Sequence, residues 1–425
     1  MRRIALCALA LMLAPLLAPR NALALDAAAE AGVAFLAGTV NPDGSWGGTP
    51  TSLTGRLHTT AEAVRSLRAL GADDIAAFDD ALGFLAAQEP SITELIGRRA
   101  EALGGLVDLG DELATLLATQ NVDGGWGARA GFSSNVLDTA LALRALHALG
   151  IPPGTIVQGE TVASGVPDVL AVEVPPGSTQ LRIVVTALSG SIDVRIRQGS
   201  VPPITDPFFH LTAAPVQIVL TPTSFPALVA GQNYIRIDTA SSATYSLEVS
   251  VVAPAGNGSV TLAGARYLLG ARNADGGWGL GGQDGDSRVF YSSEAALAVA
   301  RSIAPGAAIA FLLTRRNADG GFGDDGTSTA FETALTLRAL TAMGFDPTSL
   351  SPSPVAYLAA SQLADGSWIE DPYSTALAIE VVGLGAPTPS PTATPTPTAT
   401  ATPTPTPTPT PTSTASPTPV VTPSP

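Results

Sequence analysis

The sequence predicts a mainly α protein of helix-turn-helix repeats that is interrupted by an inserted all-β domain and followed by a disordered Pro/Thr tail. Three observations predict this fold. Five Asp-Gly turns recur, each lying between two short apolar segments of helical periodicity. The chain between the second and third turns changes to β-branched, alternating residues. The last segment is dominated by Pro and Thr and carries no charge, which favours an extended, solvated stalk.

Each of the five turns ends on a large aromatic residue. Asp-Gly is typical of a tight turn, because Gly adopts positive φ freely and Asp hydrogen-bonds to the backbone two residues later. We expect the aromatic residues to be structural packing anchors of these turns. The five anchors are Trp46, Trp126, Trp278, Phe322 and Trp368.

The spacing of the anchors gives the number of helical units. Phe322 lies 44 residues after Trp278, and Trp368 lies 46 residues after Phe322. The 80 residues between Trp46 and Trp126 leave room for one further unit, which residues 81–105 can supply. The sequence therefore predicts six helix pairs, in which residues 25–150 form the first half and residues 256–385 the second.

The segment 151–255 is predicted to be the inserted domain. The sequence between Trp126 and Trp278 is longer than one helical unit, and this segment supplies the extra residues. Its short runs of Val, Ile, Leu and Tyr are separated by Pro and Gly turns, which indicates seven or eight short strands. About 100 residues of this kind predict a β-sandwich or a jelly roll.

The two ends of the chain have segments that we do not expect to belong to the folded part. Residues 1–24 resemble a bacterial-type secretory signal peptide: Arg2 and Arg3 precede an apolar stretch, and Ala22-Leu23-Ala24 forms a small-residue cleavage site. Residues 386–425 form the Pro/Thr stalk. We therefore expect a secreted, extracellular or cell-surface protein.

Composition excludes several kinds of chemistry. All 21 basic residues are Arg, so the chain lacks the lysine that Schiff bases and P-loops require. The formal net charge of −15 without a basic run argues against a nucleic-acid partner. The single cysteine, Cys7, lies in the signal segment, so the mature chain offers no thiolate. We expect no metal, no cofactor and no transmembrane helix.

Some turns resemble the QW repeat of squalene/hopene cyclases and prenyltransferases. Tyr357 and Leu358 are followed by Gln362, Gly366 and Trp368 in the order of that repeat. The resemblance covers roughly residues 27–150 and 256–385, and it implies an (α/α)6 toroid whose inner helices line a central cavity. The inserted domain resembles the pre-peptidase C-terminal domain of secreted bacterial proteins. The segments Gly231–Ile237 and Tyr245–Leu247 carry that second resemblance.

The catalytic residues that this resemblance implies are missing. Hopene cyclases protonate their substrate with an Asp at a position where the best alignment places Leu137. The zinc-ligating Cys of protein prenyltransferases and the thioester Cys of related toroids are also absent. We therefore expect no catalytic residue, and we expect a non-catalytic module that binds a small or apolar ligand or an extracellular protein or polysaccharide. The alternative is a divergent terpenoid-cyclase-like enzyme.

A set of polar residues is predicted to form the rim of the cavity. Aligning the inner helices by their apolar residues places four acids at equivalent positions: Glu62, Asp138, Glu294 and Glu332. If they surround one mouth, they could hold a cation or another ligand. The alternative is that they are acids of a first helical turn, which interact favourably with the helix dipole. The candidate ligand-binding rim also includes His58, Asn135, Tyr291 and Tyr373.

Overall fold

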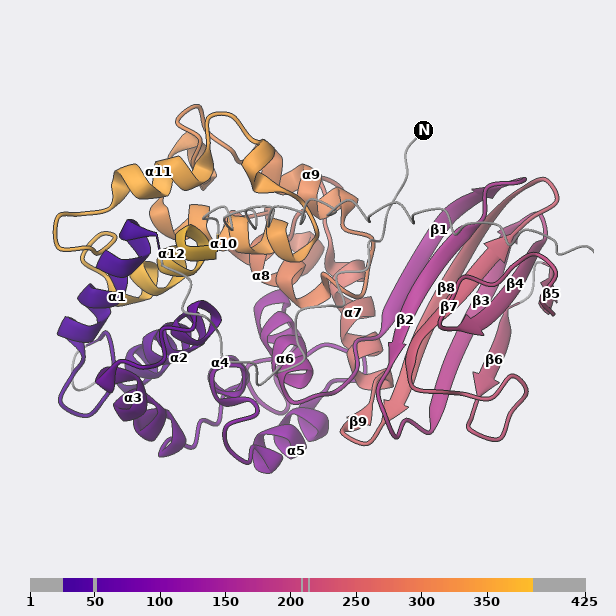
Figure 1. The fold of residues 1–425 in the computed structure, drawn as a ribbon, viewed down its shortest axis with the longest axis horizontal. Coiled ribbons are helices and arrows are strands. Elements are labelled where there is room, and N and C mark those ends of the chain that lie inside the picture. Colours follow the sequence, from indigo (N-terminus) through magenta and orange to yellow (C-terminus); the bar gives the residue numbers. More distant parts are fainter. Residues whose placement is uncertain (1–25, 49–51, 208, 213–214, 385–425) are drawn as a thin grey trace, which may run out of the picture. The chain divides into compact units, whose positions relative to one another are not determined.

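A computed structural model describes residues 26–48, 52–207, 209–212 and 215–384. The predicted signal segment (1–24) and the Pro/Thr tail (386–425) lie outside these residues. Within them the chain forms twelve α-helices and nine β-strands (Figure 1).

The helices form two sets, an inner set and an outer set. The inner helices are α2 (Leu53–Leu70), α4 (Thr93–Leu103), α6 (Val136–Ala148), α8 (Val289–Val299), α10 (Ala330–Ala342) and α12 (Pro372–Leu384). The outer helices are α1 (Ala27–Thr39), α3 (Ala76–Ala86), α5 (Gly110–Thr119), α7 (Ser259–Ala271), α9 (Gly306–Thr314) and α11 (Pro354–Ser361).

The strands all lie between α6 and α7. They are β1 (Thr155–Ala163), β2 (Asp168–Val174), β3 (Gln180–Ser189), β4 (Ile192–Gln198), β5 (Phe209–Leu211), β6 (Val216–Leu220), β7 (Gly231–Asp238), β8 (Ser242–Ala253) and β9 (Gly256–Asn257). The structure is 43% helical and 19% strand, so the predicted class, mainly α, is wrong and the chain is a mixed α and β protein. The error arises because the six helix pairs were taken to determine the class, whereas the inserted segment is almost entirely in strands.

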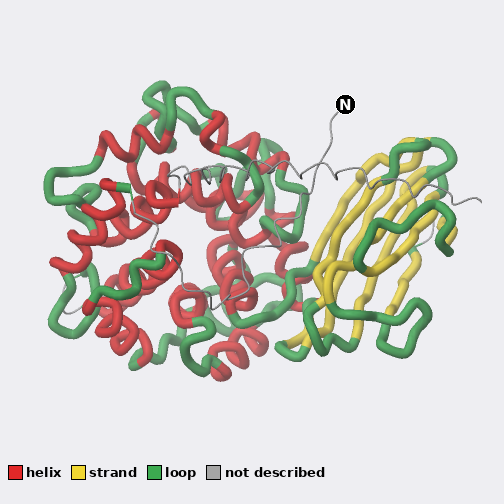
Figure 2. Tube along the Cα trace, in the orientation of Figure 1, coloured by secondary structure: helices red, strands yellow, loops and turns green. Residues whose placement is uncertain are grey.

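The inner helices form a closed ring. Each inner helix packs against the next one along the chain, and α12 packs against α2, so that helices from opposite ends of the chain lie side by side (Figure 1). The outer helices pack against the outside of this ring, with α1 against α12 and α7 against α6. In Figure 2 the helices therefore surround a common centre.

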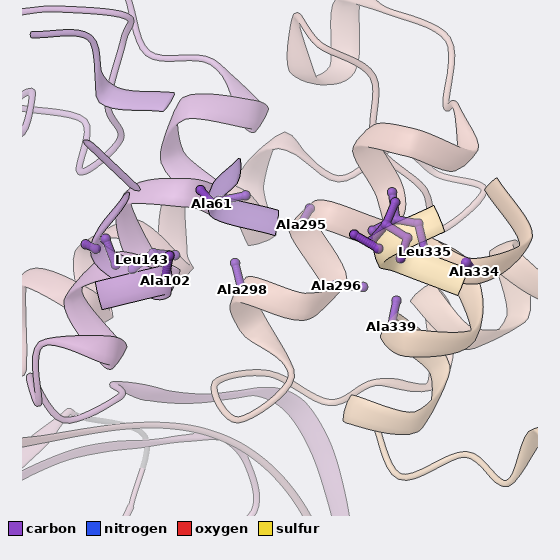
Figure 3. Close-up of a cluster of buried hydrophobic side chains, with 14 of the residues drawn as sticks. Ala61, Ala102, Leu143, Ala295, Ala296, Ala298, Ala334, Leu335 and Ala339 are labelled. Carbon is purple, nitrogen blue, oxygen red and sulfur yellow. The ribbon is translucent and has the colours of Figure 1, made fainter. Parts of the chain in front are cut away.

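Alanine lets the inner helices approach one another closely. Ala61, Ala295 and Ala334 come from α2, α8 and α10, and each is at most 2% exposed. Figure 3 shows them with further alanines and leucines of the same buried cluster. Because Ala also has the highest helix propensity, the same residue type favours both the helices and their packing.

The aromatic anchors join each outer helix to the inner helix that follows it. In each Trp turn the indole N–H donates to a carbonyl ten residues earlier, at 2.7–2.8 Å. The main-chain N–H of every anchor donates to a hydroxyl on the next inner helix, at 2.8–3.0 Å. These hydroxyls belong to Thr60, Thr139, Ser292, Thr333 and Thr375. All five anchors are completely buried.

The last turn closes the ring onto the first outer helix. Gly366 has a φ of 87°, and a Cβ at this position would lie 2.3 Å from the carbonyl oxygen of Ala31 in α1. The side chain of Gln362 donates to the carbonyl of Ala28 at 2.8 Å. Only glycine permits both the positive φ and this close approach.

The strands form two antiparallel sheets with a core of their own. One sheet has the order β1-β8-β3-β6, with β9 paired to β8, and the other has the order β2-β7-β4-β5. Burial alternates along β3 and β7, as expected for strands with one face on a core. The inserted segment is therefore β, as the sequence predicted. None of the described helices is long and apolar enough to cross a membrane.

The chain leaves and re-enters the helical ring at adjacent points. The Thr261 hydroxyl donates to the carbonyl of Pro152 at 2.6 Å and accepts from the N–H of Gly154 at 3.0 Å. α6 and α8 also pack directly against each other. The inserted strands therefore do not interrupt the contact between the two halves of the ring.

Candidate functional site

The hydroxyls bound by the anchors give the inner helices a common register. Measured from these hydroxyls, the four predicted rim acids lie at two levels rather than one. Asp138 and Glu332 directly precede Thr139 and Thr333, whereas Glu62 and Glu294 follow Thr60 and Ser292 by two residues. The apolar alignment did not separate these levels, because Ala and Leu recur so closely along the inner helices that several registers match.

Asp138 and Glu332 lie in the first turns of α6 and α10. Asn135 accepts from the Asp138 N–H at 2.9 Å and donates to the Asp138 carboxylate at 2.5 Å. Thr329 makes the same pair of bonds with Glu332, at 3.0 and 2.9 Å. In each helix the N-cap side chain satisfies one helix-terminal N–H, and the carboxylate accepts a second bond from that same side chain. Burial raises the pKa of both carboxyls above their ordinary values.

Glu62 and Glu294 lie deeper, in a network of ion pairs that we call the ionic floor. Arg65 binds both Glu62 and Glu380, and Arg338 donates to Glu62 at 2.9 Å. On the opposite side of the ring, Arg144 and Arg98 both face Glu294. The floor consists of Glu62, Arg65, Arg98, Glu101, Arg144, Glu294, Arg338 and Glu380, and every inner helix contributes at least one of them.

The ionic floor is buried and balanced in charge. No side chain in it is more than 15% exposed, and Glu294 is 1% exposed. Burial alone would raise the pKa of the Glu62, Glu294 and Glu380 carboxyls, but the facing guanidinium groups hold all three below the ordinary value. Pairs such as Arg338 with Glu62 join helices that are not neighbours in the ring. At this level the centre of the ring is therefore filled by side chains.

A second layer, which we call the belt, lies above the floor. It consists of the residues two positions before the anchor-bound hydroxyls: His58, Leu137, Phe290, Phe331 and Tyr373. Their rings contact one another around the circle, with centroid distances of 4.4 Å from His58 to Tyr373, 5.8 Å from Tyr373 to Phe331 and 5.8 Å from Phe331 to Phe290. All five are half-buried, and we call the solvent-accessible side of this layer the mouth.

Helix α4 completes the mouth with charged groups. Arg98 donates to Glu94 at 3.2 Å and approaches the Tyr373 hydroxyl at 3.5 Å. Burial, reinforced by the Arg98 charge, lowers the pKa of His58 to about 4, so His58 is neutral at pH 7. Within the described chain its Nε2 is buried without a hydrogen-bond partner. The charge of Glu94 also raises the pKa of Asp138, whereas hydrogen bonds from Asn135 and from the Glu94 backbone lower it. The mouth is thus polar beside α2, α4 and α6 and aromatic beside α8, α10 and α12.

Several of these residues were not found from the sequence. The ring of Tyr291 packs against that of Phe290, with a centroid distance of 5.2 Å. Phe290, Phe331 and Glu94 were not among the predicted rim residues. The sequence signal that could have located the belt is the Ser or Thr that binds each anchor. The belt residue lies two positions before it. Leu137, where the sequence analysis placed the missing acid, lies in the belt and is half-buried.

The arrangement offers acid and aromatic groups rather than metal ligands. In the described part of the chain, no group of three or more His, Cys, Asp or Glu side chains could hold a metal ion. A carboxyl with a raised pKa is suited to donate a proton. Aromatic faces are suited to stabilise a cation.

The fold is that of a terpenoid cyclase. The apo structure of the type II terpene cyclase MstE from Scytonema matches 85% of this chain and 98% of its own, with a TM-score of 0.50 and 12% sequence identity. Two variants of that cyclase also match. One is in complex with geranylgeranyl dihydroxybenzoate, its substrate (12% identity, 84% of this chain, 95% of that chain, TM-score 0.47). The other is in complex with merosterolic acid A, its product (12% identity, 84% of this chain, 95% of that chain, TM-score 0.48).

Sequence comparison adds no family assignment. No protein-family profile matches the chain, and no curated protein matches it in sequence. At 12% identity the likeness to the cyclase establishes the fold alone.

The comparison corrects our expectation of function. We predicted a non-catalytic module, but the fold that this chain shares over 85% of its length is the fold of an enzyme. That finding favours the alternative, a terpenoid-cyclase-like enzyme, over the binding module. The sequence-based expectation relied on the missing acid at Leu137 and the missing cysteines, and it assigned the neighbouring Asp138 to a ligand-binding rim.

Proposed function

We propose that the chain is a terpenoid-cyclase-like enzyme that protonates a carbon–carbon double bond of a small isoprenoid at its mouth. Asp138 is the proton donor, and the aromatic rings of the belt stabilise the cation that forms. The observation that carries the proposal is the position of Asp138. This buried carboxyl with a raised pKa directly follows Leu137 of the belt.

The reaction needs no cofactor. The proton of the Asp138 carboxyl forms a new C–H bond with one alkene carbon, using the π electrons, and the other carbon becomes a carbocation. A second double bond of the substrate can attack this cation and close a ring. Loss of a proton from an adjacent carbon to the Asp138 carboxylate then restores the acid, so the product is an isomer of the substrate.

The two sides of the mouth have different roles in this proposal. The rings of Phe290, Phe331 and Tyr373 present π faces, and a cation near such a face gains about 0.5–2 kcal/mol, more where water is excluded. Arg98 and Glu94 on the opposite side suit a polar end group of the substrate. The neutral His58 ring lies between the two sides, in contact with Tyr373.

Three further proposals concern relationships and location. We propose that the helical ring is related to the squalene/hopene cyclase and prenyltransferase repeat family, which the QW-like turns support. The inserted sheets are proposed to be a pre-peptidase C-terminal-like domain, which residues 231–247 support. Residues 1–24 are proposed to direct export. Expression with residues 1–24 fused to a reporter, followed by assay of the medium, tests this last proposal.

Deuterium incorporation tests the reaction. In D2O, proton transfer from Asp138 places deuterium in the isomerised product of an acyclic isoprenoid, which mass spectrometry detects. Asp138→Asn should reduce incorporation at least a hundredfold, because the amide cannot donate the required proton. Glu332→Gln is the matched control, since Glu332 occupies the equivalent capping position on α10. Equal loss in both variants, or no loss in Asp138→Asn, would contradict the assignment.

A further inference from the structure

We propose that a cavity between the inserted sheets and the helical ring binds a primary alkylammonium group of about five carbons. Asp168 and Glu160 hold the ammonium group, and apolar side chains of both hydrophobic clusters enclose the alkyl chain. The cavity is separate from the mouth, so the inference goes beyond the proposed function and does not depend on it.

The cavity has a volume of about 80 Å3 and lies where the core of the ring meets the core of the sheets. Of its lining residues, Ile156 and Ile303 belong to the hydrophobic cluster of the ring. Leu170, Ile237 and Leu247 belong to the cluster of the sheets. The two clusters therefore do not pack fully against each other here, and an apolar space remains between them.

The backbone beside the cavity is fixed on both sides of a bulge in β1. The pairing of β1 with β8 shifts between Val157 and Glu160, where Gly159 has a φ of 66°. Before the bulge, the main-chain N–H of Ile156 donates to the carbonyl of Ser302 at 2.6 Å, which ties β1 to the loop after α8. After it, β1 pairs with β8 again. The cavity thus has a border of hydrogen-bonded main chain.

Two half-buried carboxyls line the cavity next to Tyr245. The Tyr245 hydroxyl donates to the Asp168 carboxylate at 3.3 Å, and Glu160 is the partner of Tyr245 in the pairing of β1 with β8. Burial and the charge of Glu160 raise the pKa of Asp168, against the hydrogen bond from Tyr245. Among the described residues, no Arg or His forms an ion pair with either carboxyl. The two acids therefore repel each other without a cation between them.

The one basic residue that lines the cavity acts elsewhere. Burial and the charge of Arg301 lower the pKa of His147, whereas the side chains that shift the pKa of Asp168 are Tyr245 and Glu160. Every basic side chain of this protein except its three histidines is an Arg. No side chain of the protein can therefore supply a primary ammonium group, and the occupant must be another molecule.

The volume and the lining together define the ligand. A water-sized group needs about 10–15 Å3 of such space, so the cavity takes about five to eight non-hydrogen atoms. A bare cation would leave the apolar walls uncovered, and in the described chain no group of three or more His, Cys, Asp or Glu could hold a metal ion. A primary ammonium on a short alkyl chain places its charge at the acids and its methylene groups against the apolar walls.

Three ligands of equal length test the inference: pentylammonium, 1-pentanol and pentanoate. Their binding to the full chain is measured by calorimetry at pH 7. We expect pentylammonium to bind at least tenfold more tightly than 1-pentanol, because only the ammonium is attracted by both carboxylates, and pentanoate not to bind. A smaller preference for pentylammonium, a preference for pentanoate, or no binding of pentylammonium overturns the inference.

Asp168→Asn locates the site. The change keeps the shape of the side chain but removes its charge, so we expect pentylammonium to bind at least tenfold more weakly and 1-pentanol to bind as in the parent. Glu173→Gln is the matched control, because Glu173 is an exposed acid of the same strand outside the cavity. A folded Asp168→Asn variant with the affinity of the parent overturns the inference. If that variant does not fold, Glu160→Gln takes its place with the same expected loss.

The blocked amino acid Nα-acetyl-lysine amide identifies the source of the ammonium group. It carries the same group on a peptide backbone. An affinity within tenfold of that of pentylammonium assigns the cavity to a lysine side chain of a partner protein, and a weaker one assigns it to a free amine. Deuterium incorporation should be the same in Asp168→Asn and in the parent, so the site and the proposed reaction can fail separately.

Discussion

At the scale of single residues, the aromatic anchors combine burial with two hydrogen bonds. The indole of Trp126 is completely buried and donates to the carbonyl of Leu116 at 2.8 Å, while its main-chain N–H donates to Thr139. The side chain thereby fixes the end of α5 relative to the start of α6. Phe322 makes the main-chain hydrogen bond but has no indole N–H, so one of the five turns lacks the bond to the preceding outer helix.

Trp126→Phe should destabilise the chain by about 1–3 kcal/mol. The smaller ring leaves the buried carbonyl of Leu116 without this donor and opens a small cavity. Urea unfolding followed by circular dichroism measures the change. Val122→Ala, at a fully exposed position of the same turn, is the control and should stay within about 0.5 kcal/mol of the parent. A Trp126→Phe variant as stable as this control would show that the indole bond does not matter.

Two half-buried histidines, His58 and His147, make the stability depend on acid. Burial, with the charges of Arg98 on His58 and Arg301 on His147, lowers both pKa values from 6.5 to about 4. A lowered folded-state pKa means that the unfolded chain binds protons more readily. The stability from these residues is therefore complete above pH 6.5 and is lost as the pH falls towards 4. Each histidine accounts for on the order of 2–3 kcal/mol over this window.

Melting temperatures between pH 7 and pH 4 test this expectation. His147→Gln should flatten the decline between pH 6.5 and 4, because the amide does not titrate. Val122→Ala changes an exposed side chain without a titratable group and should leave the decline as it is in the parent. Below about pH 4.5 the protonation of Glu62, Glu294 and Glu380 should destabilise all variants, because their pKa values are lowered in the folded chain. An unchanged slope in His147→Gln would contradict the assignment.

At the scale of elements, four of the five turns are shaped by a glycine that touches an outer helix. Gly276 has a φ of 93°, and a Cβ there would lie 2.3 Å from the carbonyl oxygen of Ala307 in α9. Gly276→Ala should therefore destabilise the chain by more than about 1–2 kcal/mol, since both the φ and the contact are unfavourable for Ala. Gly83→Ala is the opposite case, because this glycine lies in α3 with open space around its Cα. It should stabilise the chain by about 0.5–1 kcal/mol in chemical unfolding.

The elements also show how much the sequence could predict. The Asp-Gly turns and the spacing of Trp278, Phe322 and Trp368 predicted the helix pairs, because turn chemistry and period are local properties of the chain. The β character of residues 155–257 followed from alternation in the same way. The levels of Glu62 and Asp138 could not be predicted in this way, because helices rich in Ala and Leu have no single apolar face that fixes their register. The ionic floor was missed for a further reason: its pairs join residues up to 315 positions apart, which no local pattern reveals.

At the scale of the whole molecule, the ring is built from two halves with a β insertion between them. The ionic floor crosses both places where the halves meet. Arg65 with Glu380 joins α2 to α12, and Arg144 with Glu294 joins α6 to α8. Since the residues that make these contacts all lie in the helices, the ring does not depend on the sheets for its closure. Most buried residues of the strands form a separate hydrophobic cluster, whereas Ile156 of β1 belongs to the cluster of the ring.

Removing the sheets should therefore leave the ring folded. Deleting residues 155–254 and bridging Gly154 to Ala255 with a short Gly/Ser linker keeps Pro152 and Gly154, which contact Thr261 at the junction. The deletion does remove Ile156, which is buried against the ring and whose N–H donates to the carbonyl of Ser302. We expect a loss of about 2–4 kcal/mol from this side chain and its hydrogen bond.

Circular dichroism and thermal melting of the deleted chain test whether the halves close on their own. The helical signal should persist and melt in one transition at a lower temperature than in the parent. Adding Glu294→Gln to the deletion is the informative second variant, because it leaves Arg144 and Arg98 facing an uncharged partner at the α6–α8 contact. Breaking such a buried pair costs about 3–5 kcal/mol, so this variant should lose the transition or melt far lower. A deletion variant without helical signal would mean that the sheets hold the two halves together. A melting temperature that Glu294→Gln does not lower would mean that the ionic floor does not hold the halves together.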